Sequence, residues 1–245
     1  MRILNQNKLA LGDLSWSSQL EKYKFSDAFA DVALSRWAKF ASNTAQFLQL
    51  SVEEKTPVYY AYILKTNFAA AASVTIQCSD DGFATIAEEH ALTRIGVDWF
   101  YRNDSGLSYK AYRIAITDTT VTYPRLSKLY LGGYMELPGA TDISDSLKSG
   151  AKSDKSDSGQ IYGFPTVILK PLTVAYDIVE HDERVAIESH FRAYDKITPA
   201  VVIMYEDSMD VSAPLYCNMT DDPEFKKIMT QGVTYQLTLK FEECK

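Results

Sequence analysis

The sequence predicts a mainly β protein with an N-terminal β-sandwich and a small C-terminal α+β domain. Through the first 138 residues, short apolar segments alternate with turns rich in Gly, Pro and Asp, and helical spacing is rare. A polar segment at 139–159 follows, and beyond it one helical pattern precedes a strongly alternating strand. Many short strands between turn residues indicate a sandwich, whereas mixed periodicities indicate an α+β domain. Apolar residues make up 46% of the 245, which is enough to build packed cores.

The strands predicted for the sandwich combine apolar residues with period-two alternation. In residues 73–78 the apolar side chains stand at every second position, as they do at Tyr112, Ile114 and Ile116. This spacing places the apolar side chains on one face of a strand. We therefore expect strands at 47–51, 59–64, 73–78, 109–116 and 126–131.

Residues 139–159 divide the chain. The segment GATDISDSLKSGAKSDKSDSG is rich in Ser, Asp, Lys and Gly and contains no aromatic residue. Such a composition buries too little apolar surface to offset the entropy lost on ordering. We expect a flexible linker here, between a sandwich at 1–138 and an α+β domain at 160–245.

The C-terminal segments show helical and strand patterns. The segment HDERVAIESHFRAYDK at 181–196 predicts a helix, because Ile187, Phe191 and Tyr194 share one face. A second, short helix is predicted over 223–229, since Asp222 before Pro223 is typical of a helix start. Strands are expected at 167–179, 201–205 and 233–241.

Charge and cysteine content exclude several classes of protein. The formal net charge of −7 argues against binding nucleic acid through its phosphates. No apolar run approaches the roughly 20 residues of a membrane span, and the N-terminus lacks signal-peptide features, so synthesis in the cytoplasm is expected. Three widely spaced cysteines without a CxxC pair predict neither a disulfide framework nor a zinc site.

Residues suited to catalysis are few. The only histidines are His90, His181 and His190, and the usual motifs of zinc hydrolysis, serine hydrolysis and nucleotide binding are absent. We predict that the protein is not an enzyme and carries no cofactor, with no catalytic or metal-ligating residue to name.

The stretch VTIQCSDDG at 74–82 admits two interpretations. Its carboxylates, Asp80 and Asp81, could bind calcium, but the spacing of an EF-hand loop is missing. Turn chemistry explains the same residues, with Asp at early positions and Gly82 where φ is positive. We predict a turn, and we predict that Cys78 is a core residue in phase with the preceding strand.

Aromatic residues are the best recognition candidates. Trp99 and Tyr101 lie among charged neighbours in the segment DWFYR at 98–102. Such rings either pack within a sheet or form an exposed platform for a sugar or a partner protein. Together with Tyr23, they are the predicted ligand-binding residues if the platform exists.

From about residue 9 to 137 the chain resembles a discoidin-type, galactose-binding-like jelly roll. The matching motifs, in chain order, are SRW at 35–37, FLQL at 47–50, YIL at 62–64, VTIQCSDDG at 74–82, YRI at 112–114 and LYLG at 129–132. Sugar-binding members often carry Asp-Gly in a calcium-supporting loop, whereas here Asp31 is followed by Val32, so calcium is not implied. No set of sugar-binding residues carries over from the family.

The resemblance extends to the variant of this fold in tailed bacteriophages. YKFSDAF at 23–29 and LSKLYLG at 126–132 are similar to segments of that variant. SGQIY at 158–162, PAVVI at 199–203 and the final strand at 235–242 are similar to phage tail-tip and distal tail domains. The resemblance therefore implies a virion protein of the tail tip or baseplate.

Two hypotheses of function follow. The first is a non-enzymatic tail component, whose partners would be other tail proteins and further copies of itself in a ring assembled through residues 160–245. The alternative is a carbohydrate-binding module that recognises host surface glycans. A hydrolase is disfavoured by the missing motifs.

Overall fold

The protein is mainly β and folds into two compact units. In the computed structural model, one unit comprises Leu4–Met135 and the other comprises Met1–Ile3 together with Glu136–Lys245. The predicted fold class, a β-sandwich followed by a smaller α+β part, is confirmed. The structure describes residues 2–30, 36–137, 139–145, 148–149, 152–155, 161–164, 168–169, 171–194, 200–203, 214–230 and 232–244.

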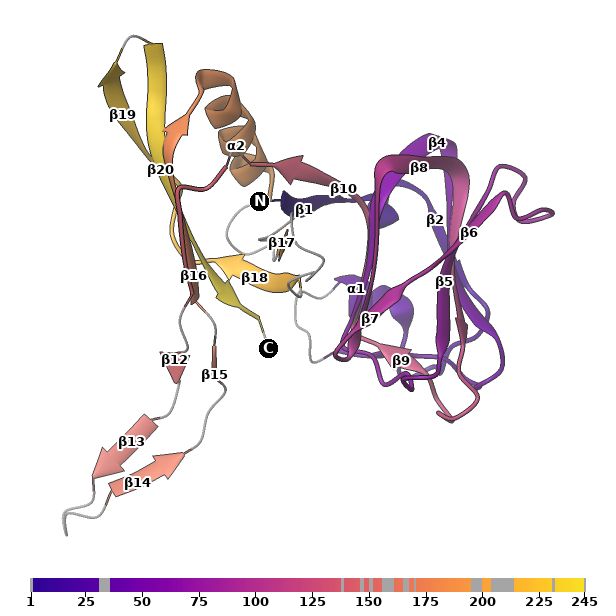
Figure 1. Ribbon diagram of the computed structural model, residues 1–245. Helices are drawn as coiled ribbons and strands as arrows, with labels where there is room; N and C mark the ends of the chain where they lie inside the picture. The colour runs from indigo at the N-terminus through magenta and orange to yellow at the C-terminus, as the bar shows by residue number, and fades with distance from the viewer. Residues whose placement is uncertain are drawn as a thin grey trace. The chain divides into compact units, whose positions relative to one another are not determined.

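The first unit is built from antiparallel strands with two short helical segments (Figure 1). The strands β1 and β10 each cross the boundary between the units. The helical segments are η1 (Lys8–Leu11) and α1 (Phe25–Ala30). The strands are β1 (Arg2–Asn7), β2 (Asp13–Trp16), β3 (Ala38–Lys39), β4 (Gln46–Leu64), β5 (Ser73–Ser79), β6 (Glu88–Ala91), β7 (Thr93–Ile95), β8 (Asp98–Thr117), β9 (Arg125–Leu126) and β10 (Lys128–Glu136).

Two long strands, β4 and β8, contribute to both layers of the sandwich. In one layer, the first part of β4 pairs with the last part of β8, and the strands β2 and β5 flank this pair. In the other layer, the last part of β4 pairs with the first part of β8, and the strands β10 and β7 flank it. Between these pairings the register shifts at Ser51/Thr56 and again at Val58/Tyr60. Such bulges bend a strand and increase its twist, so both strands curve from one layer into the other. The sequence predicted separate strands at 47–51 and 59–64, and the structure joins them into one bent strand.

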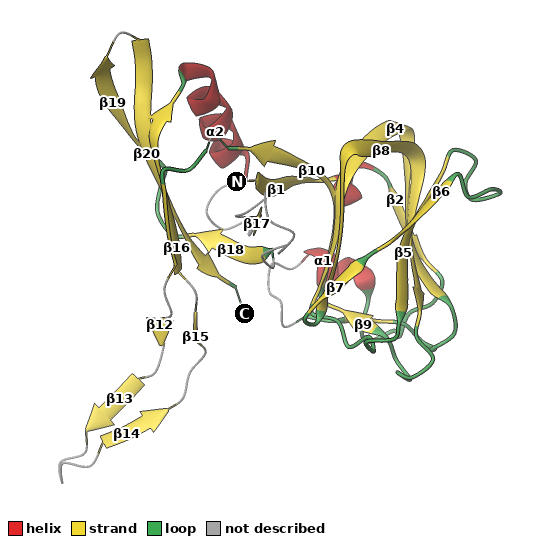
Figure 2. Cartoon of the chain, viewed as in Figure 1, coloured by secondary structure: helices red, strands yellow, loops and turns green. Residues whose placement is uncertain are grey.

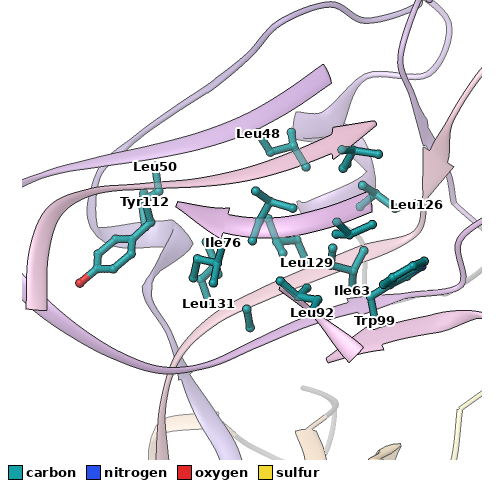
Figure 3. Close-up of a cluster of buried hydrophobic side chains, with 14 of the residues drawn as sticks. Leu48, Leu50, Ile63, Ile76, Leu92, Trp99, Tyr112, Leu126, Leu129 and Leu131 are labelled. Atoms are coloured by element: carbon teal, nitrogen blue, oxygen red, sulfur yellow. The ribbon is translucent and has the colours of Figure 1, made fainter. Parts of the chain in front are cut away.

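The apolar core lies between the two layers (Figure 3). Leu48, Ile76 and Ile114 enter it from one layer, and Ile63 and Leu129 enter it from the other. All five side chains are buried, as their period-two spacing predicts.

The hydroxyl of Tyr112 joins the bent segments of β4 and β8. It accepts a hydrogen bond from the Tyr109 backbone N–H at 2.8 Å, and it lies within hydrogen-bond distance of the carbonyls of Leu107, at 2.6 Å, and Thr56. Tyr112 is fully buried, and its hydroxyl points away from the apolar side chains (Figure 3). It therefore provides hydrogen-bond partners for backbone groups beside the bulge.

We expect Tyr112→Phe to lower the free energy of unfolding by about 1–3 kcal/mol, because a buried N–H and at least one carbonyl lose their partner. Urea denaturation of the full chain measures this. The matched control is Tyr123→Phe at an exposed tyrosine, with an expected change within about 0.5 kcal/mol. Equal stabilities for the two variants would contradict this role of Tyr112.

The second unit contains part of the large sheet, an added hairpin strand and, among its described residues, one helix (Figure 2). Along β16 and β20, alternate side chains are buried, among them Leu172, Val174, Leu237 and Leu239. The predicted helix is confirmed as α2 (His181–Tyr194), which contacts β20 and buries Ile187. In order across the sheet, the strands are β11 (Asp142–Asp145), β16 (Pro171–Val179), β20 (Gly232–Glu243), β18 (Leu215–Met219) and β17 (Ala200–Ile203).

The predicted short helix at 223–229 is wrong. These residues form the strand β19 (Glu224–Thr230), which pairs with β20 from Glu224 opposite Thr238 to Thr230 opposite Gly232. The Asp-Pro signal suits a turn before a strand as well as a helix start, and β20 offers a pairing partner along the whole segment. Pairing with β20 thus outweighs the preference for a helix that the residues around Pro223 indicate.

Part of the polar segment at 139–159 forms strands, and its role as a flexible linker stays a prediction. It contains β11, β12 (Lys148–Ser149) and β13 (Lys152–Lys155). The strand β11 pairs with β16, β12 with β15 (Ile168–Leu169), and β13 with β14 (Ile161–Phe164). Composition alone misses these strands because backbone pairing requires no apolar side chain.

Some sequence-based expectations fall wholly or partly outside the described residues. These include Asp31 with Val32, the end of the strand expected at 201–205, and the start of SGQIY at 158–162. Among the described residues, no helix is long and apolar enough to cross a membrane.

Candidate binding surface at the loop end of the sandwich

Trp99 belongs to the core of the sandwich. Its side chain is 4% exposed, and its ring lies 6.5 Å from that of Phe68 (Figure 3). It presents no open ring face to a ligand, so packing within the sheet describes it better than an exposed platform does. Trp99 on β8 lies directly opposite Ile63 on β4, and cross-strand neighbours of this kind pack against each other on one face of the sheet.

Tyr101 lies in a polar cluster at the edge of β6. Its ring stacks on His90 with centroids 5.3 Å apart, and its hydroxyl accepts a hydrogen bond from the Asn103 amide at 3.2 Å. The Glu88 carboxylate lies 2.9 Å from His90 Nε2 and accepts a 2.6 Å hydrogen bond from the Tyr109 hydroxyl. That last bond lowers the pKa of Glu88 and raises the pKa of Tyr109 to about 12. The side chains of this cluster therefore satisfy one another.

The carboxylates of VTIQCSDDG shape a turn, as predicted. Asp81 accepts hydrogen bonds from the Ser79 hydroxyl at 2.6 Å and from the Thr85 hydroxyl at 2.7 Å, and Gly82 has φ +71°. Asp80 pairs with Lys55 at 2.5 Å. Among the described residues, no three His, Cys, Asp or Glu side chains gather as a metal site.

We expect Asp81→Asn to reduce the dependence of stability on acid pH. Hydrogen bonds from Ser79 and Thr85 lower the pKa of Asp81 from 3.8 to about 2. The stabilisation from this carboxylate is therefore complete above 3.8 and is lost as the pH falls towards about 2. Urea denaturation across this pH range should show a smaller loss of stability in the variant than in the natural chain. Asp13→Asn, at another exposed carboxylate, is the control and should keep the natural slope.

The loop end of the sandwich holds two cationic side chains directly opposite each other. Here β3 pairs with β9, with Ala38 opposite Leu126 and Lys39 opposite Arg125. Ala38 and Leu126 are both fully buried. Since neighbouring side chains on a strand point to opposite faces, Lys39 and Arg125 share the face that turns away from the core. Like charges placed this way destabilise a strand pair.

Each of the two cations lies over an aromatic ring. The Arg125 guanidinium carbon is 4.2 Å from the centre of the Trp37 ring, and Lys39 Nζ is 3.6 Å from the centre of the Tyr23 ring. Such contacts contribute about 0.5–1 kcal/mol each at exposed sites. Among the described residues, neither cation forms an ion pair, and Arg125 Nε is buried without a hydrogen-bond partner.

Hydrogen bonds fix the backbone that carries Tyr23, Lys39 and Arg125. Asn67 connects two loops, because its side-chain oxygen accepts from the Arg125 N–H at 2.8 Å and its amide group donates to the Tyr123 carbonyl at 3.1 Å. The Lys39 N–H donates to the Tyr23 carbonyl at 3.2 Å, and the Phe40 N–H donates to Pro124. The loops that carry these residues gather at the end of the sandwich away from the bend of β4 and β8 (Figure 2). We call Tyr23, Trp37, Lys39 and Arg125 the cation–aromatic patch.

Sequence reasoning found only Tyr23 of this patch as a ligand-binding candidate. The local signal was present, since Tyr23 stands between Lys22 and Lys24, and Trp37 follows Arg36. The pairing of Lys39 with Arg125 could not be read from the sequence, because it joins two loops far apart in the chain. Tyr23 belongs to a different cluster from Trp99 and Tyr101, so the structure does not gather the three predicted residues in one place.

No protein-family model matches the chain, and no curated protein matches it. Similar solved structures include a fucose-binding module from Streptococcus pneumoniae, which is 9% identical with a TM-score of 0.42 over 52% of this chain and 95% of the module. A mutant of the lectin-binding domain of lectinolysin, complexed with Lewis b, is 8% identical with a TM-score of 0.42 over 55% and 99%. The family 32 carbohydrate-binding module of NanJ from C. perfringens, in complex with galactose, is 12% identical with a TM-score of 0.42 over 55% and 100%. Similarity at this level does not define a ligand or a binding residue for this chain.

Proposed function

We propose that the unit Leu4–Met135 is a non-catalytic glycan-binding module and that the cation–aromatic patch is its binding surface. The observation that carries the proposal is the pair of opposed cations, each placed over an aromatic ring, on loops that hydrogen bonds hold in position. Rings beside fixed polar donors suit a sugar, whose apolar faces stack and whose hydroxyls accept hydrogen bonds.

The backbone that carries the cation–aromatic patch is already held in position before a ligand binds, which favours a role in binding. A loop held by Asn67 and by the buried Phe40 loses little further entropy when a ligand arrives. The solved modules named above are described with fucose, Lewis b and galactose, whereas the proposal for this chain rests on its own side chains.

The other predicted function, a structural part of a phage tail tip or baseplate, stays a prediction. Nothing in the comparisons indicates a tail or virion protein, and neither a ring of copies nor a phage partner is supported. The glycan hypothesis therefore replaces it as the leading one.

We expect the full chain to bind members of a glycan array, and Trp37→Ala to weaken that binding about tenfold, since a stacking ring contributes about 1 kcal/mol or more. Titration calorimetry with the strongest glycan measures the change. Phe47→Ala is the matched control, because Phe47 also lies against an arginine, 4.5 Å from the Arg113 guanidinium carbon, but on the sheet face. The absence of any bound glycan, or equal losses in the two variants, would contradict the proposal.

A further inference from the structure

Within the described part of the chain, Lys39 and Arg125 have no carboxylate partner. Two other cations of the same unit have carboxylate partners: Arg102 binds Asp104 through two nitrogens, at 2.8 and 2.9 Å, and Lys55 binds Asp80 at 2.5 Å. No carboxylate pairs with Lys39 or Arg125 among the described residues, although the two stand opposite each other. Like charges on directly opposed residues of a strand pair reduce its stability.

The geometry of Arg125 suits an anion. Its guanidinium carbon lies 4.2 Å from the centre of the Trp37 ring, and a guanidinium held against a ring keeps several N–H donors that suit a carboxylate or phosphate. Arg113 offers a useful contrast, because it lies between the rings of Phe47 and Phe83 and donates to the Gln49 side-chain oxygen at 2.8 Å. Arg113 therefore has an acceptor within the protein, whereas Arg125 has a buried Nε with none.

We propose that Lys39 and Arg125 form a subsite for one acidic substituent of the bound glycan, a carboxylate, sulfate or phosphate group. This inference rests on the glycan-binding function proposed above. A single anion between the two side chains offsets their repulsion and accepts charge-assisted hydrogen bonds from the guanidinium edge and from the lysine ammonium group. An acidic glycan is favoured over nucleic acid, because the formal charge of −7 repels a long polyanion while leaving room for one local anionic group.

The test compares neutral oligosaccharides with the same oligosaccharides carrying terminal sialic acid, a uronic acid or a sulfate ester. The full chain should bind the acidic members at least tenfold more tightly, and raising the salt concentration should reduce this preference. Lys39→Gln and Arg125→Gln should each remove the preference. Lys110→Gln, at an exposed lysine elsewhere on the unit, should keep it.

A second readout separates binding from folding. Lys39→Gln removes both the repulsion from Arg125 and the contact with the Tyr23 ring, two effects of opposite sign and similar size, so its urea denaturation midpoint should stay close to that of the natural chain even though acidic glycans bind less tightly. A lower midpoint, with the loss of binding explained by unfolding, would show that Lys39 has only a structural role and would overturn the inference.

The remaining outcomes are also decisive. Equal binding of neutral and acidic glycans overturns the acidic subsite and leaves the glycan-binding function standing. Binding of no glycan at all overturns both proposals. Binding of inorganic sulfate or phosphate as tight as that of the acidic glycans, or binding of DNA and heparin alone, also overturns the inference, since the ligand would then be a free ion or a polyanion.

Discussion

The pairing of β4 with β8 is the constraint on which the rest of the first unit depends. These strands of 19 and 20 residues belong to both layers, so the register of one pairing limits the register of the other. If one of these strands slipped by one residue relative to its partner, its core side chains would turn to the opposite face of the sheet. The bulge between Ser51 and Thr56 lets both strands bend, and the Tyr112 hydroxyl binds backbone groups beside the bend.

This bent pair also decides where the loops lie. Because β4 and β8 turn over at one end of the sandwich, most of their connections to neighbouring strands emerge at the other end (Figure 2). The short pair of β3 with β9 lies among these loops, outside the large sheet. Its residues Ala38 and Leu126 are buried, and this burial places Lys39 and Arg125, both half-buried, on the opposite face. The core and the cation–aromatic patch are therefore two faces of the same strand pair.

Arginine over an aromatic ring serves two purposes in this unit. On the sheet face, Arg113 is enclosed by two rings and hydrogen-bonded to Gln49, so its donors are used within the protein. At the loop end, Arg125 lies over one ring beside a second cation, and its donors face no acidic partner in the described part of the chain. The same contact is structural in the first case and compatible with ligand recognition in the second.

The sequence by itself determined the fold class, the core positions of the alternating strands, the turn at Asp81 and Gly82, and the helix at His181–Tyr194. These features depend on local periodicity and on turn chemistry, which neighbouring residues specify. The tertiary structure decided the rest. It made a strand of Glu224–Thr230, because the partner β20 satisfies its backbone, and it buried Trp99, because Ile63 lies opposite. It also brought Lys39 beside Arg125, and pairing between segments so far apart in the chain leaves no periodic signal in either one.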